Sequence, residues 1–394
     1  MEESTRVKIL VVNYEYPPVG GGGGRVAAQV AVELARRGHE VRVQTSRTGD
    51  LPSRQMVSGV DIRRVFSFRR KPDTCSVPEM AGYVVSNAWP VWQAARSWRP
   101  DVMHVHFAVP TGPVAWLAHR CTGIPYVLTA HLGDVPGGAP EQTDHLFRVV
   151  KPFTRMIWRD AAAVTAVSTH VASLAQTAYG LKPRVILNGI AARASSPPEP
   201  AADGTLRLLF VGRMSVQKNP VFLAAVLGAL RNRPWRAVFL GDGPLRGALQ
   251  DELARAGVAD RCECRGWAGE DQVRAALNCS DVLLMPSLSE GLPVAAIEAA
   301  ARGLALCGST IPGLADVLED GVNGWSCAVG DQAAWVRALE QAMDDGDGLR
   351  RRQGNSLRLA AKFDLRKIVD AYEETLVTAL RPGTTGGDTF HSPR

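Results

Sequence analysis

The same order of elements, a strand, a loop and a helix, opens each half of this chain. Residues 7–13 (V-K-I-L-V-V-N) form an apolar run typical of a buried strand, five glycines follow at 20–24, and an amphipathic pattern from about 25 to 37 ends at Gly38. Residues 39–45 then have the composition of a second strand. A helix between two such strands is the βαβ unit that begins a doubly wound parallel sheet.

The second half repeats this order after an aperiodic segment rich in proline, alanine and serine at 191–203. Because 394 residues exceed what one core usually organises, we predict an α/β protein of two doubly wound Rossmann-like domains facing each other across a cleft. The domains are expected at 1–196 and 205–370, with a linker at 197–204. Residues 371–394 are expected to hold a helix, which could cross back to the first domain, and a disordered tail. Further strands are predicted at 61–66, 102–107, 126–129, 162–167, 185–187, 206–212, 237–240, 262–266, 282–285 and 304–307.

Charge and cysteine content limit the partners and the location. The formal charge of +6 is a mild excess, so a nucleic-acid partner is not expected, whereas a phosphorylated ligand or an anionic membrane surface would suit it. Seven cysteines, an odd number without a C-x-x-C pair, predict reduced thiols and no metal site. No signal peptide and no apolar run of about 18 residues is seen. A cytoplasmic protein is predicted, with peripheral contact at the inner face of the membrane as an option.

The segment from Arg63 to Lys71 (R-R-V-F-S-F-R-R-K) is the sequence basis for that membrane option. It mixes five cations with two phenylalanines, which would suit a membrane surface or an acidic acceptor. A solvated strand edge followed by a loop explains the same composition and is favoured.

The glycine run suggests a dinucleotide site, but its spacing argues against a nicotinamide-dependent enzyme. No glycine here begins a G-x-G-x-x-G, because Arg25 or Val26 stands in the last place. The second strand also ends in Thr45 and Ser46, without the acid that binds the ribose of NAD. Backbone without side chains at a helix start still allows a phosphate or sugar to approach closely, and a merely flexible loop explains the run equally well.

Polar residues follow two of the predicted strands. The stretch Y-V-L-T-A-H-L-G-D-V-P-G-G places His131, Gly133 and Asp134 at a strand's carboxyl end, where open α/β sheets bind ligands. Arg213 and Lys218 follow the strand at 206–212, where they suit a diphosphate, the arginine by forked hydrogen bonds and the lysine as a point charge. Taken alone, these are a structural histidine and ordinary surface cations.

Two glutamates eight residues apart favour a binding site over these structural explanations. The stretch S-L-S-E-G-L-P-V-A-A-I-E-A-A-A-R-G at 287–303 places Glu290 in a turn and Glu298 in an alanine-rich helical pattern, about two turns further on. A helix that begins near Gly291 or Leu292 would direct free N–H groups toward an anion. With the two cations, the glutamates describe a site for a sugar joined to a diphosphate.

Together these motifs resemble the family 4 retaining glycosyltransferases, which have the GT-B fold. The resemblance rests on G-R-M-S-V-Q-K-N, G-D-G-P-L and the stretch at 287–303 in the second half. In the first half it rests on Y-P-P-V-G-G-G, L-A-R-R-G-H-E-V, T-A-H-L-G-D-V and L-N-G-I. These motifs follow the family's order over nearly the whole chain, and the E-x7-E pattern is the most specific of them.

The resemblance implies a donor site in the second half. Glu298 would bind the ribose hydroxyls of a nucleotide, and Glu290 the sugar hydroxyls near the anomeric carbon. Arg213 and Lys218 would neutralise the diphosphate leaving group. Neighbouring backbone would assist at Gly291, Leu292, Pro293 and Val294.

In the first half the resemblance implies contacts to both substrates. Gly21 and Gly22 would approach the donor phosphate and the acceptor, with Gly23 on the acceptor side. His131 would contact the transferred sugar, and Asp134 would position its loop or the acceptor.

Three departures from the family pattern stand out. Leu132 occupies the place of a glycine after the histidine. Leu187 and Ala191 replace the proline and aspartate of P-N-G-x-D. Leu292 and Pro293 replace an aromatic residue and a glycine, which could reshape the sugar pocket. None of these changes removes a charged group that the transfer needs.

The resemblance implies a retaining hexosyltransferase that uses a UDP- or GDP-linked sugar. The acceptor would be a hydroxyl of a cell-envelope glycan, a glycolipid or a small secondary metabolite. No cofactor or metal is expected, because two cations and a helix dipole supply positive charge at the leaving group; Asp345-Gly346-Asp347 is read as a solvated turn rather than a metal-binding D-x-D. Attack on the same face and a covalent intermediate on Glu290 are both open. Rival interpretations are a sugar-nucleotide epimerase or phosphorylase, a nicotinamide oxidoreductase and an inactive sugar-binding module.

Overall fold

Each half of the chain folds around its own β-sheet. The computed structural model describes residues 6–71, 75–138, 140–191 and 196–381. The chain divides into a first unit, Met1–Ala191 with Leu365–Arg394, and a second unit, Ala192–Asp364. The return to the first unit occurs at Leu365, six residues before the expected position at 371, because the last helix begins there.

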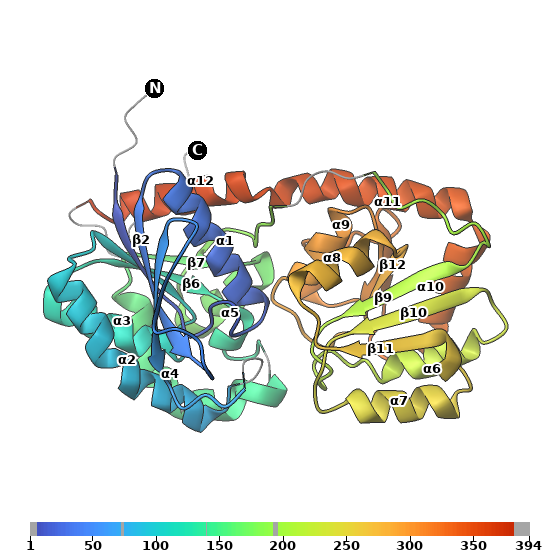
Figure 1. The fold of residues 1–394 in the computed structure, drawn as a ribbon, viewed down its shortest axis with the longest axis horizontal. Helices are drawn as coiled ribbons and strands as arrows, with labels where there is room; N and C mark the ends of the chain where they lie inside the picture. The colour runs from blue at the N-terminus through green and yellow to red at the C-terminus, as the bar shows by residue number, and fades with distance from the viewer. Residues whose placement is uncertain (1–5, 72–74, 139, 192–195, 382–394) are drawn as a thin grey trace. The chain divides into compact units, whose positions relative to one another are not determined.

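The first unit is an eight-stranded sheet in the order β3-β4-β2-β1-β5-β6-β7-β8, with only β3 and β4 antiparallel. Helices α2, α3 and α4 lie on one face, and α1 and α12 on the other (Figure 1). The strands are β1 (Lys8–Val12), β2 (Glu40–Arg47), β3 (Arg54–Val57), β4 (Val60–Phe66), β5 (Val102–His106), β6 (Tyr126–Ala130), β7 (Ala163–Ala166) and β8 (Arg184–Val185). The helices are α1 (Gly22–Arg36), α2 (Val77–Ser97), α3 (Thr111–Thr122), the 3-10 turn η1 (Leu132–Asp134), α4 (Pro140–Arg159), α5 (Thr169–Tyr179) and α12 (Leu365–Thr378).

The second unit is a six-stranded parallel sheet in the order β11-β10-β9-β12-β13-β14. Helices α6 and α7 cover one face, and α8 and α9 lie on the other (Figure 1). The strands are β9 (Leu206–Val211), β10 (Trp235–Leu240), β11 (Cys262–Gly266), β12 (Val282–Met285), β13 (Ala305–Ser309) and β14 (Gly324–Cys327). The helices are α6 (Phe222–Ala229), α7 (Arg246–Arg255), η2 (Ala259–Arg261), α8 (Glu270–Asn278), α9 (Val294–Ala300), η3 (Pro312–Leu314), α10 (Gln332–Asp344), α11 (Gly346–Ala360) and η4 (Ala361–Phe363).

The strand order of both sheets confirms the predicted doubly wound α/β architecture. In both units the apolar strand residues form the buried centre of the core, which is what their continuous apolar runs predict. Strands β3 and β14 were not predicted, because β3 is exposed at the antiparallel edge and β14 (G-W-S-C) is not a continuous apolar run.

The first helix, α1, begins at Gly22, three residues earlier than its amphipathic pattern predicts, so three glycines lie in its first turn rather than in a loop. It ends as predicted: Gly38 has φ +97°, a left-handed conformation that favours glycine. The following residue, His39, donates its amide hydrogen bond back to Leu34 O at 3.2 Å. The helix therefore closes at the glycine and the chain turns directly into β2.

Ion pairs join the last helix, α12, to the end of α1 within the first unit. Arg37 binds Asp370 and Glu373 at 2.6 and 2.7 Å, and His39 Nε2 lies 2.9 Å from Glu373 Oε1. Leu365 N also donates to Ile190 O at 3.2 Å. The final helix is thus part of the first unit's fold rather than an appendage of the second.

The Asp345-Gly346-Asp347 triplet is not the solvated turn that was predicted. Asp345 is the N-cap of α11, and its carboxylate accepts a hydrogen bond from Gly348 N at 2.8 Å. Asp347 lies in the first helical turn, where a carboxylate is favourable. The acidic pattern therefore starts a helix.

No helix among the described residues is long and apolar enough to cross a bilayer. The seven cysteines are free thiols.

Candidate functional site

In the second unit, the loops after β9 and β12 meet through an ion pair between two predicted site residues. Lys218 Nζ lies 2.5 Å from Glu290 Oε1, and the Glu290 side chain is 7% exposed. Ser287 Oγ donates to the same oxygen at 2.7 Å. Glu290 Oε2 has no hydrogen-bond partner among the described residues, so the carboxylate keeps one oxygen for a ligand.

Backbone contacts fix the geometry of this pair. Leu288 N donates to Gln217 O at 2.8 Å, and Gln217 Nε2 donates to Ser289 O at 3.1 Å. Gly313 packs against the glutamate from the other side, since a Cβ atom there would lie 1.8 Å from Glu290 O. The turn that carries the glutamate is therefore held from two directions and only a glycine fits at 313.

The α9 helix begins at Val294, later than the predicted start at Gly291 or Leu292. Pro293 is its N-cap and has no N–H, so it cannot donate a hydrogen bond to phosphate as first expected. Val294 N and Ala295 N have no hydrogen-bond partner among the described residues. Gly291 N also lacks a partner among the described residues, so these three amides are candidate donors near Glu290.

Glu298 lies four residues after the start of α9, and its residue is buried. Its position is thus one helical turn from the free amides rather than two turns from the helix start. Glu290 thus lies four residues before α9, and Glu298 lies in the second half of this short helix.

Arg213 directly follows β9 on the carboxyl edge of the sheet. It is exposed, and its guanidinium makes no hydrogen bond or ion pair with any described residue. The neighbouring β10 loop approaches this one closely: a Cβ on Gly241 would lie 1.9 Å from Gly212 O, and Met214 N donates to Asp242 O at 2.8 Å. The G-D-G motif therefore packs against the loop that carries the two cations.

In the first unit, His131 ends β6 and stacks on Phe107, with ring centroids 4.0 Å apart and planes 18° apart. Gly23 of α1 faces both rings. A Cβ there would lie 2.7 Å from Phe107 Cζ and 3.3 Å from His131 Nδ1. The glycine is required because the start of the helix approaches the imidazole closely.

Two further histidines, which the sequence analysis missed, lie behind His131. His106 Nδ1 is 3.4 Å from His131 Nε2, and the rings of His104 and His106 are 4.2 Å apart. Burial lowers the pKa of His104 and of His131 to about 3, and that of His106 well below its usual value. All three rings are therefore neutral near pH 7. The alternation in V-M-H-V-H, which places both side chains on one face of β5, was the available signal.

Asp134 is fully buried and faces inward. Its carboxylate accepts hydrogen bonds from His131 N at 2.8 Å and from Val109 N at 3.4 Å. Burial raises the pKa of this carboxyl group to about 7, against those hydrogen bonds, which lower it. Of the two roles expected for Asp134, the geometry fits positioning of the histidine loop.

Gly21 donates its amide hydrogen to a protein carboxylate, Glu15 Oε2, at 3.0 Å. Glu15 thus occupies the start of α1, the place where a donor phosphate was expected near Gly21 and Gly22. Gly20 and Gly24 also pack on Glu15, since their Cβ atoms would lie 2.5 and 3.0 Å from its atoms. The sequence analysis missed Glu15, although it stands five residues before the glycine run.

The segment from Arg63 to Lys71 is not a continuous basic surface. Arg69 is buried and reaches Glu15 Oε1 at 3.4 Å, and Arg64 is buried and donates to Pro17 O at 3.2 Å. These two arginines support the loop after β1. They therefore form neither a membrane-binding patch nor the solvated strand edge that the sequence favoured. Phe66 and Phe68 are exposed.

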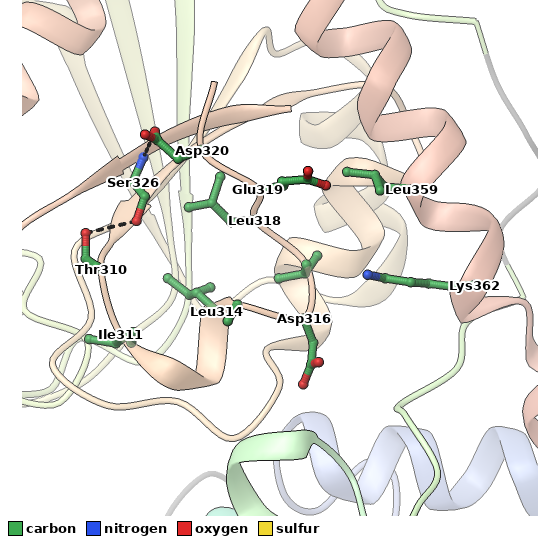
Figure 2. A pocket seen from close by; sticks show the side chains of 12 residues that line it. Thr310, Ile311, Leu314, Asp316, Leu318, Glu319, Asp320, Ser326, Leu359 and Lys362 are labelled. Atoms are coloured by element: carbon green, nitrogen blue, oxygen red, sulfur yellow. Dashed lines mark hydrogen bonds between the residues drawn. The ribbon is translucent and has the colours of Figure 1, made fainter. Parts of the chain in front are cut away.

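A cavity of about 390 Å³ lies in the second unit between the loop after β13 and the end of α11. Figure 2 shows its carboxylates and hydroxyls, with Ser326 N donating to Asp320 and Thr310 beside Ser326. None of the predicted site residues lines this cavity, although Gly313 in the same loop contacts Glu290. Among the residues that the structure describes, no group of three His, Cys, Asp or Glu side chains could hold a metal ion.

Comparison with known proteins shows which family the chain resembles. A model described as "Glycosyltransferase Family 4" matches residues 20–193, and one described as "Glycosyl transferases group 1" matches 205–345. The chain is 28% identical over 400 residues to a glycogen synthase of Mycobacterium tuberculosis, covering 95% of each chain. It is 30% identical over 366 residues to the 2-deoxystreptamine N-acetyl-D-glucosaminyltransferase of Streptomyces fradiae, covering 84% of this chain and 85% of that one.

Solved structures share the architecture. A sucrose-phosphate synthase from Thermosynechococcus elongatus superposes with a TM-score of 0.79 at 18% identity, covering 94% of this chain and 98% of that one. The Anabaena protein HepE, crystallised with UDP and glucose, superposes with a TM-score of 0.76 at 17% identity, covering 94% and 100%. At these identities the likeness establishes the fold.

Proposed function

The chain belongs to the family 4 glycosyltransferases of the GT-B fold, and from that premise we propose that it is a retaining hexosyltransferase whose donor site is the Lys218–Glu290 cluster of the second unit. The observation that carries this proposal is the Lys218–Glu290 ion pair, which leaves one carboxylate oxygen open four residues before the start of α9, where backbone amides are free; Arg213 stands in the same loop as Lys218. This arrangement has positive groups for a diphosphate and an acceptor oxygen for a sugar hydroxyl.

The proposed donor is a sugar linked to a nucleoside diphosphate, UDP or GDP. Lys218 and Arg213 would neutralise the diphosphate, and Val294 N and Ala295 N would donate hydrogen bonds to its oxygens. Glu290 Oε2 would accept a hydrogen bond from the sugar, and Glu298 would hold the ribose hydroxyls. Charge complementarity supports the assignments to the diphosphate, and the hydrogen-bond acceptor character of the carboxylates supports the assignments to hydroxyl groups.

The chemical step breaks the bond between the anomeric carbon and the phosphate oxygen, and the bonding electron pair leaves with the diphosphate. The acceptor oxygen forms the new bond to the anomeric carbon, and its proton passes to an oxygen of the leaving diphosphate. Negative charge grows on the diphosphate during this step, so cations and N–H groups fixed beforehand stabilise the transition state most. Because Lys218, Arg213 and the backbone amides at the start of α9 would supply that positive charge, we propose that the reaction needs no metal or cofactor.

We propose attack on the same face in preference to a covalent intermediate. Glu290 Oε1 is bound by both Lys218 Nζ and Ser287 Oγ, which suits a carboxylate that holds a hydroxyl and lowers its nucleophilicity. His131 and the first turn of α1 would contact the transferred sugar and the acceptor.

The proposed acceptor is a hydroxyl of a polyhydroxylated compound. The named acceptors of two relatives, 2-deoxystreptamine and D-inositol 3-phosphate, are cyclitols and support this class, whereas a glycogen synthase points to a glucan. Cell-envelope glycans and glycolipids are the wider alternatives.

The test is a thermal-shift screen of UDP- and GDP-sugars, followed by measurement of nucleoside diphosphate release with and without cyclitol and glucan acceptors. Acceptor-dependent release with an α-configured product from an α-linked donor is expected. Binding without release would indicate an inactive sugar-binding module. Conversion of the donor sugar without a glycosylated acceptor would indicate an epimerase. Transfer of the sugar to inorganic phosphate, in place of a hydroxyl acceptor, would indicate a phosphorylase.

A further inference from the structure

The most unusual surface of the first unit is a row of exposed apolar side chains, here called the apolar stripe: Phe66, Phe68, Val85 and Trp89. Their exposed fractions lie between 54 and 77%. Soluble proteins rarely leave several large apolar side chains exposed together unless that surface meets a partner. None of these four residues is among those assigned to sugar transfer.

The members of the stripe are contiguous. The rings of Phe66 and Phe68 are 5.0 Å apart, and a Cβ on Gly82 of α2 would lie 3.0 Å from Phe68 Cδ2. Val85 and Trp89 follow Gly82 on the same face of α2, three and seven residues further along (Figure 1 shows α2). Trp89 in turn packs on Trp92, with ring centroids 4.6 Å apart. The apolar surface therefore continues from the end of β4 along the helix.

Cations stand at both ends of the stripe. Arg70 and Lys71 are exposed beside Phe68, and Arg96 lies over the Trp92 ring at 5.7 Å from its centroid. The single acidic residue of α2, Glu79, accepts hydrogen bonds from Ser76 N at 2.7 Å and Arg70 N at 2.9 Å. A partner that complements this surface would therefore be apolar opposite the stripe and negatively charged opposite its two ends.

We propose that the apolar stripe binds the surface of an anionic lipid bilayer. Tryptophan and phenylalanine insert at the headgroup boundary, while lysine and arginine beside them attract anionic headgroups. A second copy of the chain fits less well, because a two-fold interface would place identical cations opposite one another. This inference does not depend on the transfer reaction. The sequence left membrane contact through the whole segment 63–71 as an option, and the proposal assigns the contact to the apolar stripe instead.

The test measures binding of the full chain, without donor, to vesicles of phosphatidylcholine alone and of phosphatidylcholine mixed with phosphatidylglycerol. Wild type is expected to float with the anionic vesicles and to dissociate at high salt. Val85→Glu should lower the partition coefficient at least tenfold. Arg70→Gln and Lys71→Gln should each lower it about fivefold.

The matched control is Val329→Glu, which places the same charge on an exposed valine of the second unit. It should bind vesicles like wild type, and Val85→Glu should still transfer sugar to a soluble acceptor at the wild-type rate. Equal vesicle binding by the two valine variants, or no binding by wild type, would overturn the proposal. A dimer in solution that Val85→Glu dissociates would assign the stripe to a second copy instead.

Discussion

Removing the cation of the Lys218–Glu290 pair and removing its carboxylate should have opposite effects on nucleotide binding. Glu290 holds Lys218 at 2.5 Å, so a diphosphate must compete with that carboxylate for the ammonium group. Glu290→Gln releases the lysine, and we expect UDP or GDP affinity to stay equal or rise. Lys218→Met removes a charge-assisted hydrogen bond of about 1.5–3 kcal/mol, and affinity should fall roughly tenfold or more. Both variants should lose turnover.

The stability effects follow from burial of the same pair. Removing one partner of a buried ion pair costs about 3–5 kcal/mol, because the other charge is left uncompensated. The Glu290 side chain is 7% exposed and the Lys218 side chain 21%, and Ser287 Oγ still donates to the carboxylate when the lysine is absent. We therefore expect Lys218→Met to cost about 2 kcal/mol, below that range. Glu290→Gln keeps a hydrogen-bond acceptor and should cost about 1 kcal/mol.

The double variant decides whether the pair explains these effects. Lys218→Met with Glu290→Gln removes both charges, so it should be more stable than Lys218→Met alone. Calorimetry would measure stability, and isothermal titration with UDP and GDP would measure affinity. Two results would refute the idea that Glu290 and the donor diphosphate compete for Lys218. One is stability losses that add in the double variant, and the other is nucleotide affinity that falls in both single variants.

Three further predictions concern residues placed by the structure. Gly23→Ala puts a methyl group 2.7 Å from Phe107 Cζ, so calorimetry should show a loss of about 1–3 kcal/mol, while nucleotide affinity measured by titration is unchanged. Glu298→Gln should weaken binding of nucleoside diphosphates at least tenfold but leave binding of pyrophosphate unchanged, and competition titration separates the two. Burial lowers the pKa of His104 to about 3 from 6.5, so its neutral form contributes stability above about pH 6.5 that is lost as pH falls toward 3. His104→Gln should therefore flatten the fall of the melting temperature between pH 7 and 4.

Periodicity predicts the sheets well, because each central strand is buried on both faces and its sequence is an apolar run. The glycine that ends α1 is also visible, since Gly38 adopts the left-handed conformation at a helix end. Local patterns are less informative where partners are distant in sequence. Glu15 and Arg69 are 54 residues apart, and Lys218 and Glu290 are 72 apart, so neither pair has a spacing signature.

Helix starts show a second limit of sequence patterns. The alanine-rich stretch after Glu290 fits a helix from Gly291 onward. A proline, however, disfavours the helical conformation in the residue before it, so Leu292 stays outside the helix and Pro293 is the N-cap. The consequence is chemical, because Pro293 has no N–H, and the amides without a partner among the described residues are those of Gly291, Val294 and Ala295. The family resemblance points to the whole stretch, and only the backbone hydrogen bonds show which of its amides lack a partner.

The helix starts of α1 and α9, both predicted from the sequence as anion sites, differ in the groups that already bind their free N–H groups. At α1 the conspicuous glycine run already has an anion, since Glu15 Oε2 accepts the Gly21 amide and Arg69 balances the carboxylate. A donor phosphate there would have to displace a buried protein charge, which is unfavourable. At α9 two amides are free and Lys218 stands close to its start, paired only with a carboxylate that keeps one oxygen open. We therefore propose that the negative diphosphate binds at α9, while Gly24 packs closely against Glu15 and Gly23 against His131.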